Sequence, residues 1–140
     1  MIYFAYGSNM SRARLEARVG RVVDLGAARL DGYRHAFAKP GLDGSGKGAI
    51  LVDPNDHVWG VRYELNARQV AVLDDFEGLG TDYRRATVDV AGEPAITYVQ
   101  VRVVDGLRPT DDYLQYYLDG MREHGIPEEY VDRIRRQARG

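Results

Sequence analysis

The spacing of apolar residues predicts a chain with several strands and a few helices. The first residues, 2–6, form a continuous apolar and aromatic run, which is typical of a strand buried on both faces. Every second residue of 59–65 is apolar, which predicts a strand with one buried face. Further strands are expected in 21–39, 49–52, 83–90 and 95–103. The sequence "DPND" at 53–56 predicts a turn that joins two strands into a hairpin.

Start and stop signals indicate the helices. Ser8, Asn9 and Ser11 are candidate N-caps for a helix that ends at Gly20. A second helix, capped by Asn66 and stopped by Gly78, is expected from Ala67 to Glu77, and two more over 111–124 and 127–138. Since these helices interrupt a strand-rich middle without regular alternation, we expect an α+β fold with one mixed, curled sheet, a partial barrel with surrounding helices. The expected domain organisation is a single domain over 1–140.

Composition narrows the class of partner. The chain has 140 residues, no cysteine and a net charge of −2, from 19 basic and 21 acidic residues. This balance gives no field that would gather nucleic acid or a membrane surface, so we expect a small-molecule partner. No basic and apolar leader and no long apolar span are present, and we expect a cytoplasmic protein. The sequence has no heptad pattern and no exposed apolar stripe, and it leaves the oligomeric state open.

Three familiar kinds of catalytic site do not fit the sequence well. Residues 41–47 match the start of a phosphate-binding loop, but Gly48 replaces the magnesium-binding hydroxyl and a strand follows instead of a helix, which indicates a flexible loop. The three histidines lie in different elements without ligand spacing, so no metal is expected. Ser8 lacks the surrounding glycines of a nucleophile elbow, and a Ser8 nucleophile is kept only as an alternative.

Glu77 is the best candidate for acid–base chemistry. On the helix 67–77, Val70, Leu73 and Phe76 form an apolar stripe, and helical geometry places Glu77 between the first two. A carboxyl group held against apolar side chains has a raised pKa and suits proton transfer. If the last helical turn before Gly78 frays, however, Glu77 points to solvent.

The turn after the first strand offers a complementary feature. The backbone amides of 7–9 lie at a strand-to-helix junction, where they create a partial positive charge suited to a carboxylate or an oxyanion. Gly7 lacks a Cβ and allows a ligand to approach the backbone closely. A buried base and a set of amide donors together outline an active site.

Several segments together resemble the γ-glutamylcyclotransferase family, also described as AIG2-like proteins. They are "YFAYGSNM" at 3–10, "ARLDGYRHAF" at 28–37, "VWGVRYEL" at 58–65, "LDDFEG" at 73–78 and "YLQYYLDGMREHGIPEEY" at 113–130. The resemblance covers nearly the whole chain and implies a curled sheet with a pocket at its open side. It implies that Glu77 is the catalytic acid and base. The substrate-binding residues that it implies are Tyr3, Phe4, Ala5, Tyr6, Gly7, Ser8, Asn9, Tyr83 and Tyr113.

Two of these tyrosines have a second interpretation. Alternation in 83–90 places Val88 and Val90 on the core face and Tyr83 on the opposite face. Tyr113 and Tyr117 belong to a helical stripe that is typical of core packing as well as of a site.

The resemblance also implies an activity without cofactor or metal. The α-amine of a γ-glutamyl amine, peptide or conjugate attacks its own γ-carbonyl, which yields 5-oxoproline and a free amine. The turn over 3–8 then holds the glutamyl α-carboxylate. A non-catalytic relative that binds an amino-acid-like ligand is the alternative, and the sequence does not indicate the leaving amine.

Overall fold

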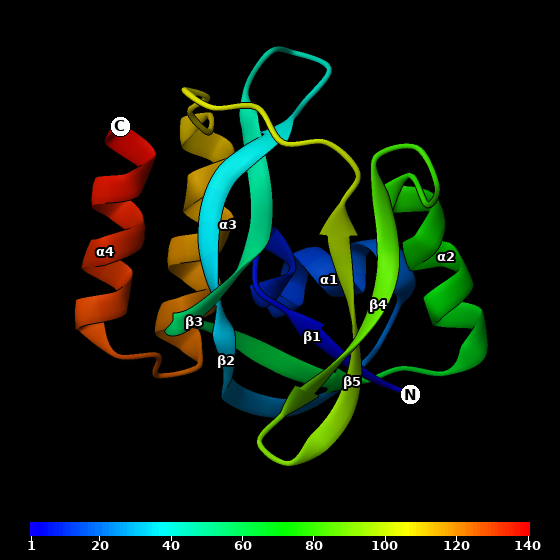
Figure 1. The fold of residues 1–140 in the computed structure, drawn as a ribbon. Helices are drawn as coiled ribbons and strands as arrows, with labels where there is room; N and C mark the ends of the chain where they lie inside the picture. Colours follow the sequence, from blue (N-terminus) through cyan, green and yellow to red (C-terminus); the bar gives the residue numbers. More distant parts are fainter.

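Five strands form one open, mixed sheet with the order β2-β3-β1-β5-β4 in the computed structural model, which describes residues 1–140. The strands are β1 (Ile2–Ala5), β2 (Val23–Pro40), β3 (Gly46–Glu64), β4 (Tyr83–Val90) and β5 (Glu93–Gln100). Neighbouring strands are antiparallel except β1 and β5, which are parallel. The long strands bend, and the sheet curls as Figure 1 shows. The predicted α+β fold with a curled mixed sheet is confirmed.

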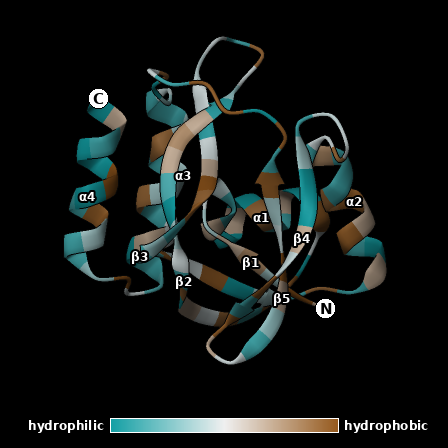
Figure 2. Cartoon of the chain, viewed as in Figure 1, coloured by the Kyte–Doolittle hydropathy of each residue, from teal (hydrophilic) through white to brown (hydrophobic).

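Four helices and one short 3-10 helix surround the sheet. They are η1 (Ser8–Met10), α1 (Arg12–Val19), α2 (Ala67–Glu77), α3 (Asp111–Glu123) and α4 (Glu128–Arg139). Helices α3 and α4 lie together beside β2 and β3, whereas α2 lies at the other side, near β4 (Figure 1). Figure 2 shows hydrophilic residues along most of α4, whose few apolar side chains are buried. None of the helices is long and apolar enough to cross a membrane.

The predicted capping residues begin and end the helices. Ser11 caps α1 by accepting a hydrogen bond from the Arg14 amide, 3.3 Å away. Asn66 and Gln69 form a reciprocal capping box at the start of α2. Gly78 ends α2 in the left-handed conformation, with φ at +62°, which a residue with a side chain rarely adopts.

The predicted hairpin at 53–56 is wrong. Strand β3 runs through this segment, and its partner in a long hairpin is β2, with the turn at 41–45. The pairing jumps from Asp31 opposite His57 to Tyr33 opposite Val52, so residues 53–56 have no partner in β2. Pro54 lies in this unpaired excursion, where its missing amide hydrogen breaks no ladder bond. The turn signals therefore mark a bulge within one strand.

Two apolar assignments also differ from the structure. Phe76 does not belong to the buried stripe of α2: it is 55 % exposed, and the Arg18 guanidinium lies 5.0 Å from its ring centre. Strand β5 ends at Gln100, and Val101 and Val103 beyond it are exposed. Phe76 lies on the side of α2 that faces α1, where a cation covers its ring instead of apolar side chains.

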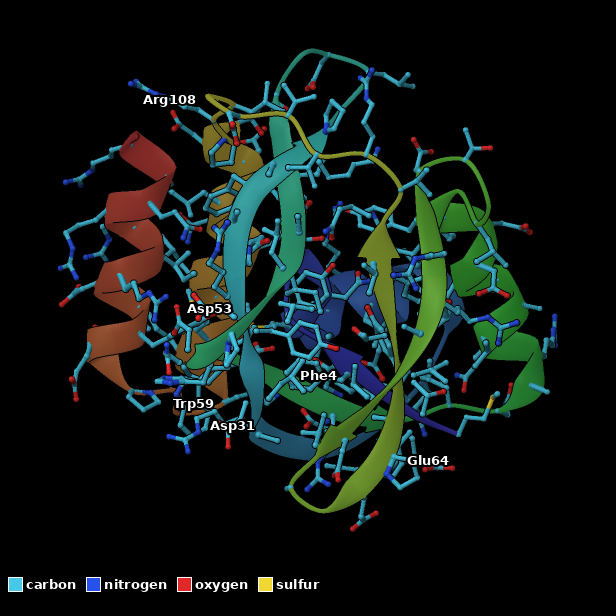
Figure 3. All side chains as sticks on the ribbon, in the orientation of Figure 1. Phe4, Asp31, Asp53, Trp59, Glu64 and Arg108 are labelled. Atoms are coloured by element: carbon cyan, nitrogen blue, oxygen red, sulfur yellow. The ribbon has the colours of Figure 1, made fainter.

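The core lies on both faces of the sheet. Tyr3 belongs to the larger cluster, which also contains the predicted one-face residues Val61 and Tyr63, while Phe4 belongs to the smaller cluster. Figure 3 shows Phe4 in the middle of the fold. Because successive residues of a strand point to opposite faces, β1 contributes to both clusters. This short central strand ends directly at the candidate site.

Candidate active site

A cavity of about 440 Å³ opens where the end of β1 meets α2, β4, α3 and the β2–β3 hairpin. Most of the residues predicted for the site contribute to its wall. These are Tyr3, Tyr6, Gly7, Ser8, Asn9, Glu77, Tyr83 and Tyr113. Segments far apart in the sequence therefore meet at one place.

Phe4 and Ala5 do not line this cavity, which corrects the expectation for their side chains. Phe4 is fully buried in the smaller core cluster, and its carbonyl accepts a hydrogen bond from Thr97. Ala5 is 1 % exposed and packs in the larger cluster. The alternation along β1 turns Phe4 away from Tyr3, and the Ala5 methyl group is covered by core residues.

Glu77 is the last residue of α2, and its carboxyl group lines the cavity. The last turn of the helix is intact, so the alternative of a frayed end is not seen. Burial raises the pKa of Glu77 to about 7, although Arg18 and Arg14 oppose this shift. A carboxyl group with this pKa exchanges its proton readily near neutral pH.

Asn9 joins Glu77 to the first strand. Its side-chain nitrogen Nδ2 donates to Glu77 Oε1 at 3.2 Å and to the Tyr3 hydroxyl at 3.1 Å. Asn9 is 3 % exposed, so the amide group is fixed in the wall of the cavity. The hydrogen bond to Glu77 favours the charged carboxylate and partly offsets burial.

The turn after β1 presents free backbone donors. The amides of Gly7, Ser8 and Asn9 donate to no group of the chain, although the next two amides close the 3-10 turn onto the carbonyls of Gly7 and Ser8. The Ser8 hydroxyl accepts a hydrogen bond from Arg14 Nε at 2.9 Å, and no histidine or carboxylate is bonded to it. Three free amides next to an arginine favour an anion.

Tyr83 and Tyr113 both bind the backbone of Gly48. Tyr83 donates to the Gly48 carbonyl at 2.6 Å, and the Gly48 amide donates to the Tyr113 hydroxyl at 3.0 Å. A Cβ at position 48 would lie 2.3 Å from the Tyr117 hydroxyl, so any other residue there would force the strand or Tyr117 to move. Tyr83 lies on the face opposite Val88, as alternation predicts, and that face borders the cavity.

Tyr117 lies beneath the site in a buried polar chain. Its hydroxyl is 2.8 Å from His35 Nε2, and His35 Nδ1 is 2.5 Å from Gln137 Oε1 in α4. Since an amide oxygen only accepts, Nδ1 carries the histidine proton and Tyr117 donates to Nε2. Burial lowers the pKa of His35 to about 4, which keeps the ring neutral. Tyr117 is thus core, as its helical stripe indicates, and Tyr113 above it borders the cavity.

Four basic residues in the wall were not identified from the sequence. They are Arg14, Arg18, Lys39 and Lys47. Arg14 and Arg18 are four residues apart on α1 and therefore share one helix face, which is the only signal that the sequence held. Lys39 forms an ion pair with Asp82 at 3.0 Å, whereas the other three have no carboxylate partner.

No group of three or more histidine, aspartate or glutamate side chains is arranged to hold a metal ion. The titratable group that the cavity offers for proton transfer near neutral pH is Glu77, since burial keeps the hydroxyls of Tyr3, Tyr6, Tyr83 and Tyr113 protonated by raising their pKa values. The arrangement therefore combines one proton-transfer group, a set of backbone donors and basic side chains.

Comparisons with known proteins agree with this architecture. The profile described as "Gamma-glutamyl cyclotransferase, AIG2-like" matches residues 3–117. The bovine protein named gamma-glutamylcyclotransferase is 29 % identical over 95 % of this chain and 76 % of its own length. The human protein of that name is 26 % identical over 96 % and 77 %. A solved structure titled gamma-glutamyl cyclotransferase superposes with a TM-score of 0.87 at 27 % identity, covering 96 % of this chain and 86 % of its own. The chain belongs to the gamma-glutamyl cyclotransferase, AIG2-like family.

Proposed function

We propose that this protein is a cyclotransferase that cleaves a γ-glutamyl amide by internal attack. The α-amine of the glutamyl group forms a bond to the γ-carbon, the bond from that carbon to the leaving nitrogen breaks, and the products are 5-oxoproline and a free amine. The α-ammonium nitrogen loses two protons as it becomes the N–H of 5-oxoproline, and Glu77 takes them in turn and passes them to the leaving nitrogen, which departs as an ammonium, so no cofactor is needed. The observation that carries this proposal is the position of Glu77, which lies in the cavity wall and is joined by Asn9 to the turn with the free backbone amides.

The pKa of Glu77 suits both proton transfers. An α-ammonium group has a pKa near 8, so transfer of its proton to an ordinary glutamate costs about 5 kcal/mol. With the Glu77 pKa at about 7, the cost falls to about 1.4 kcal/mol. The protonated carboxyl group is then a ready donor to the leaving nitrogen, and such catalysis typically contributes 100- to 10,000-fold.

The first turn supplies the second requirement, which is the curled posture of the substrate. We assign the α-carboxylate of the glutamyl group to the free amides of Gly7, Ser8 and Asn9, with Arg14 beside them. Since Asn9 also bonds Glu77, a carboxylate held there brings the neighbouring α-amine close to the base. Correct orientation within one molecule can contribute roughly 7 to 11 kcal/mol to a cyclisation.

The charge of the cavity favours one class of leaving group. Arg18 and Lys47 line the wall without an ion-pair partner, and Lys47 Nζ lies 4.4 Å from the ring centre of Tyr113. These cations are not needed for the glutamyl carboxylate if the first turn binds it. They favour a leaving amine that carries its own carboxylate, as in a γ-glutamyl amino acid or peptide, over a neutral or basic amine.

Release of 5-oxoproline from a panel of γ-glutamyl compounds tests the proposal. Wild-type protein should convert at least one γ-glutamyl amino acid, and Glu77→Gln should bind it without turnover. Binding by the wild-type protein without turnover of any compound would instead support the ligand-binding relative. A covalent acyl-enzyme that Ser8→Ala abolishes would support a Ser8 nucleophile, although no histidine or carboxylate that could act as its base is bonded to Ser8.

A further inference from the structure

The hydroxyl group of Tyr3 has a free proton at the cavity wall. It accepts a hydrogen bond from Asn9 Nδ2 at 3.1 Å, and no group of the chain accepts the hydroxyl proton in return. Tyr3 is 4 % exposed, so this hydroxyl is held by packing as well as by Asn9. A hydroxyl that accepts one hydrogen bond becomes a better donor for the next one.

The other hydroxyls of the wall either donate their protons to groups of the chain or, like Ser8, accept a hydrogen bond from a donor that does not bind Glu77. Tyr6, Tyr83 and Tyr98 donate their protons to the Tyr98 carbonyl, the Gly48 carbonyl and Asp74, respectively. Tyr113 accepts from the Gly48 amide on the hairpin side of the cavity and shares no partner with Glu77. Tyr3 is therefore distinguished by sharing one donor with the base.

The shared donor fixes the spacing between Tyr3 and Glu77. Asn9 Nδ2 binds the Tyr3 hydroxyl and Glu77 Oε1 at 3.1 and 3.2 Å. The two hydrogens of an amide nitrogen point about 120° apart, which places the two oxygens about 5 to 6 Å from each other. A carbonyl oxygen facing the hydroxyl and a reacting nitrogen facing the carboxylate fit this gap with ordinary hydrogen-bond lengths.

We infer that the Tyr3 hydroxyl donates a hydrogen bond to the γ-carbonyl oxygen and stabilises the negative charge that this oxygen gains in the reaction. This role rests on the proposed cyclisation. As the amine nitrogen bonds to the γ-carbon, the π electrons of the carbonyl move onto its oxygen, and they return when the leaving nitrogen departs. Tyr3 keeps its proton throughout. Burial raises the pKa of Tyr3 well above its usual range, which agrees with a hydroxyl that donates without ionising.

Tyr3→Phe tests the inference, because it removes the hydroxyl and keeps the ring. With γ-glutamyl-alanine as substrate, kcat should fall roughly 100- to 1,000-fold, as expected for one oxyanion donor, while KM changes less than about 3-fold. The matched control is Tyr63→Phe, which removes a buried hydroxyl from the residue paired with Tyr3 across β1 and β3 and outside the cavity wall. That control should keep wild-type kcat.

Several outcomes would overturn this role. A kcat of Tyr3→Phe within about 3-fold of wild type would exclude a donor role for the hydroxyl while leaving the cyclisation intact, provided that Glu77→Gln is inactive. A large rise in KM at unchanged kcat would assign Tyr3 to substrate binding instead. No turnover by the wild-type protein would remove both proposals.

A second variant keeps the test available if Tyr3→Phe does not fold. A polyfluorinated tyrosine placed at position 3 keeps the shape of the side chain but ionises at lower pH. The pH–rate profile should then gain a descending limb, because the ionised hydroxyl has no proton to donate. A profile identical to that of the wild-type protein would contradict the inference.

Discussion

Asn9 Nδ2 lies 3.2 Å from Glu77 Oε1, and this hydrogen bond joins the first turn of the chain to the end of α2. The same nitrogen holds the Tyr3 hydroxyl at 3.1 Å. One amide group therefore sets the position of the base relative to the turn that we assign to the substrate carboxylate. Asn9 therefore affects both the position of the Glu77 carboxyl group and its pKa.

Replacement of Asn9 by alanine should raise the pKa of Glu77 further. The wild-type hydrogen bond stabilises the charged carboxylate, and its loss leaves burial less opposed. We expect the ascending limb of the kcat/KM profile, at about pH 7 in the wild-type protein, to move upward by roughly half to one pH unit. A pH–rate series on both proteins measures this shift, and an unmoved or lowered limb would show that Asn9 does not control Glu77.

Glu77→Gln should make the fold more stable at neutral pH. The pKa of Glu77 is about 7 in the folded state and near 4.5 when unfolded, so its contribution is fully present below pH 4.5 and is lost as the pH rises to 7. The variant should gain up to about 3 kcal/mol over wild type across this range. Urea unfolding at pH 4.5 and 7.5 measures the gain.

The contribution of His35 to the free energy of unfolding changes with pH in the opposite direction. Glu77→Gln and wild type are therefore compared at the same pH, where the His35 contribution is the same in both. Its folded pKa of about 4 lies below the unfolded value near 6.5, and its contribution is lost as the pH falls through that range. The exposed Asp75→Asn change at the same helix end is the matched control. An equal gain in Asp75→Asn, or no gain in Glu77→Gln, would contradict a buried Glu77 carboxyl group.

Gly48→Ala should disrupt the contact between the hairpin and α3. The added Cβ would lie 2.3 Å from the Tyr117 hydroxyl, so the strand or the tyrosine must move, at a cost of about 1 to 3 kcal/mol. Tyr117→Phe removes the clashing oxygen, although it also leaves His35 Nε2 without its donor. In a double-mutant cycle measured by thermal unfolding, the double variant should lose less stability than the sum of the losses of the two single variants. Additive costs would show that the clash is absent.

Lys47→Gln and Arg18→Gln should weaken binding of an anionic leaving group. Each change should raise KM for γ-glutamyl-alanine about 5- to 20-fold, in line with the loss of roughly 1 to 2 kcal/mol from a charge-assisted contact. The KM for γ-glutamyl-alaninamide, which lacks the second carboxylate, should change little. Arg84→Gln, an exposed position outside the cavity wall, controls for net charge. Equal effects on both substrates would show that these residues do not contact the leaving group.

The sequence predicted the parts of this fold that depend on local chemistry. Ser11, Asn66 and Gly78 begin or end helices because capping is a property of a few neighbouring residues. The role of 53–56 is not local: these residues bulge because β2 has a matching irregularity between Asp31 and Tyr33. Turn signals do not distinguish a hairpin from a bulge in a long strand.

The candidate site likewise contains some residues that the local sequence predicts and others that only the tertiary structure brings together. Glu77 was identified because its place on a helical stripe predicts burial, and the first turn because a strand ends abruptly at Gly7. Lys39 and Lys47 were missed because they reach the cavity only through the pairing of β2 with β3, which places them opposite each other. This pairing cannot be read from either segment alone. The tie of Tyr83 and Tyr113 to Gly48 likewise depends on three elements meeting, which no single segment indicates.

The most direct test of the account is the rate of 5-oxoproline release from γ-glutamyl-alanine by Glu77→Gln and by Asp75→Asn, measured beside the affinity of each protein for 5-oxoproline. We expect Glu77→Gln to lose at least about 100-fold in kcat with its affinity for 5-oxoproline retained, because the amide cannot accept the amine proton. Asp75→Asn, two residues before Glu77 on α2 and exposed, should match wild type. A Glu77→Gln protein that releases 5-oxoproline at the wild-type rate would contradict the central role of Glu77.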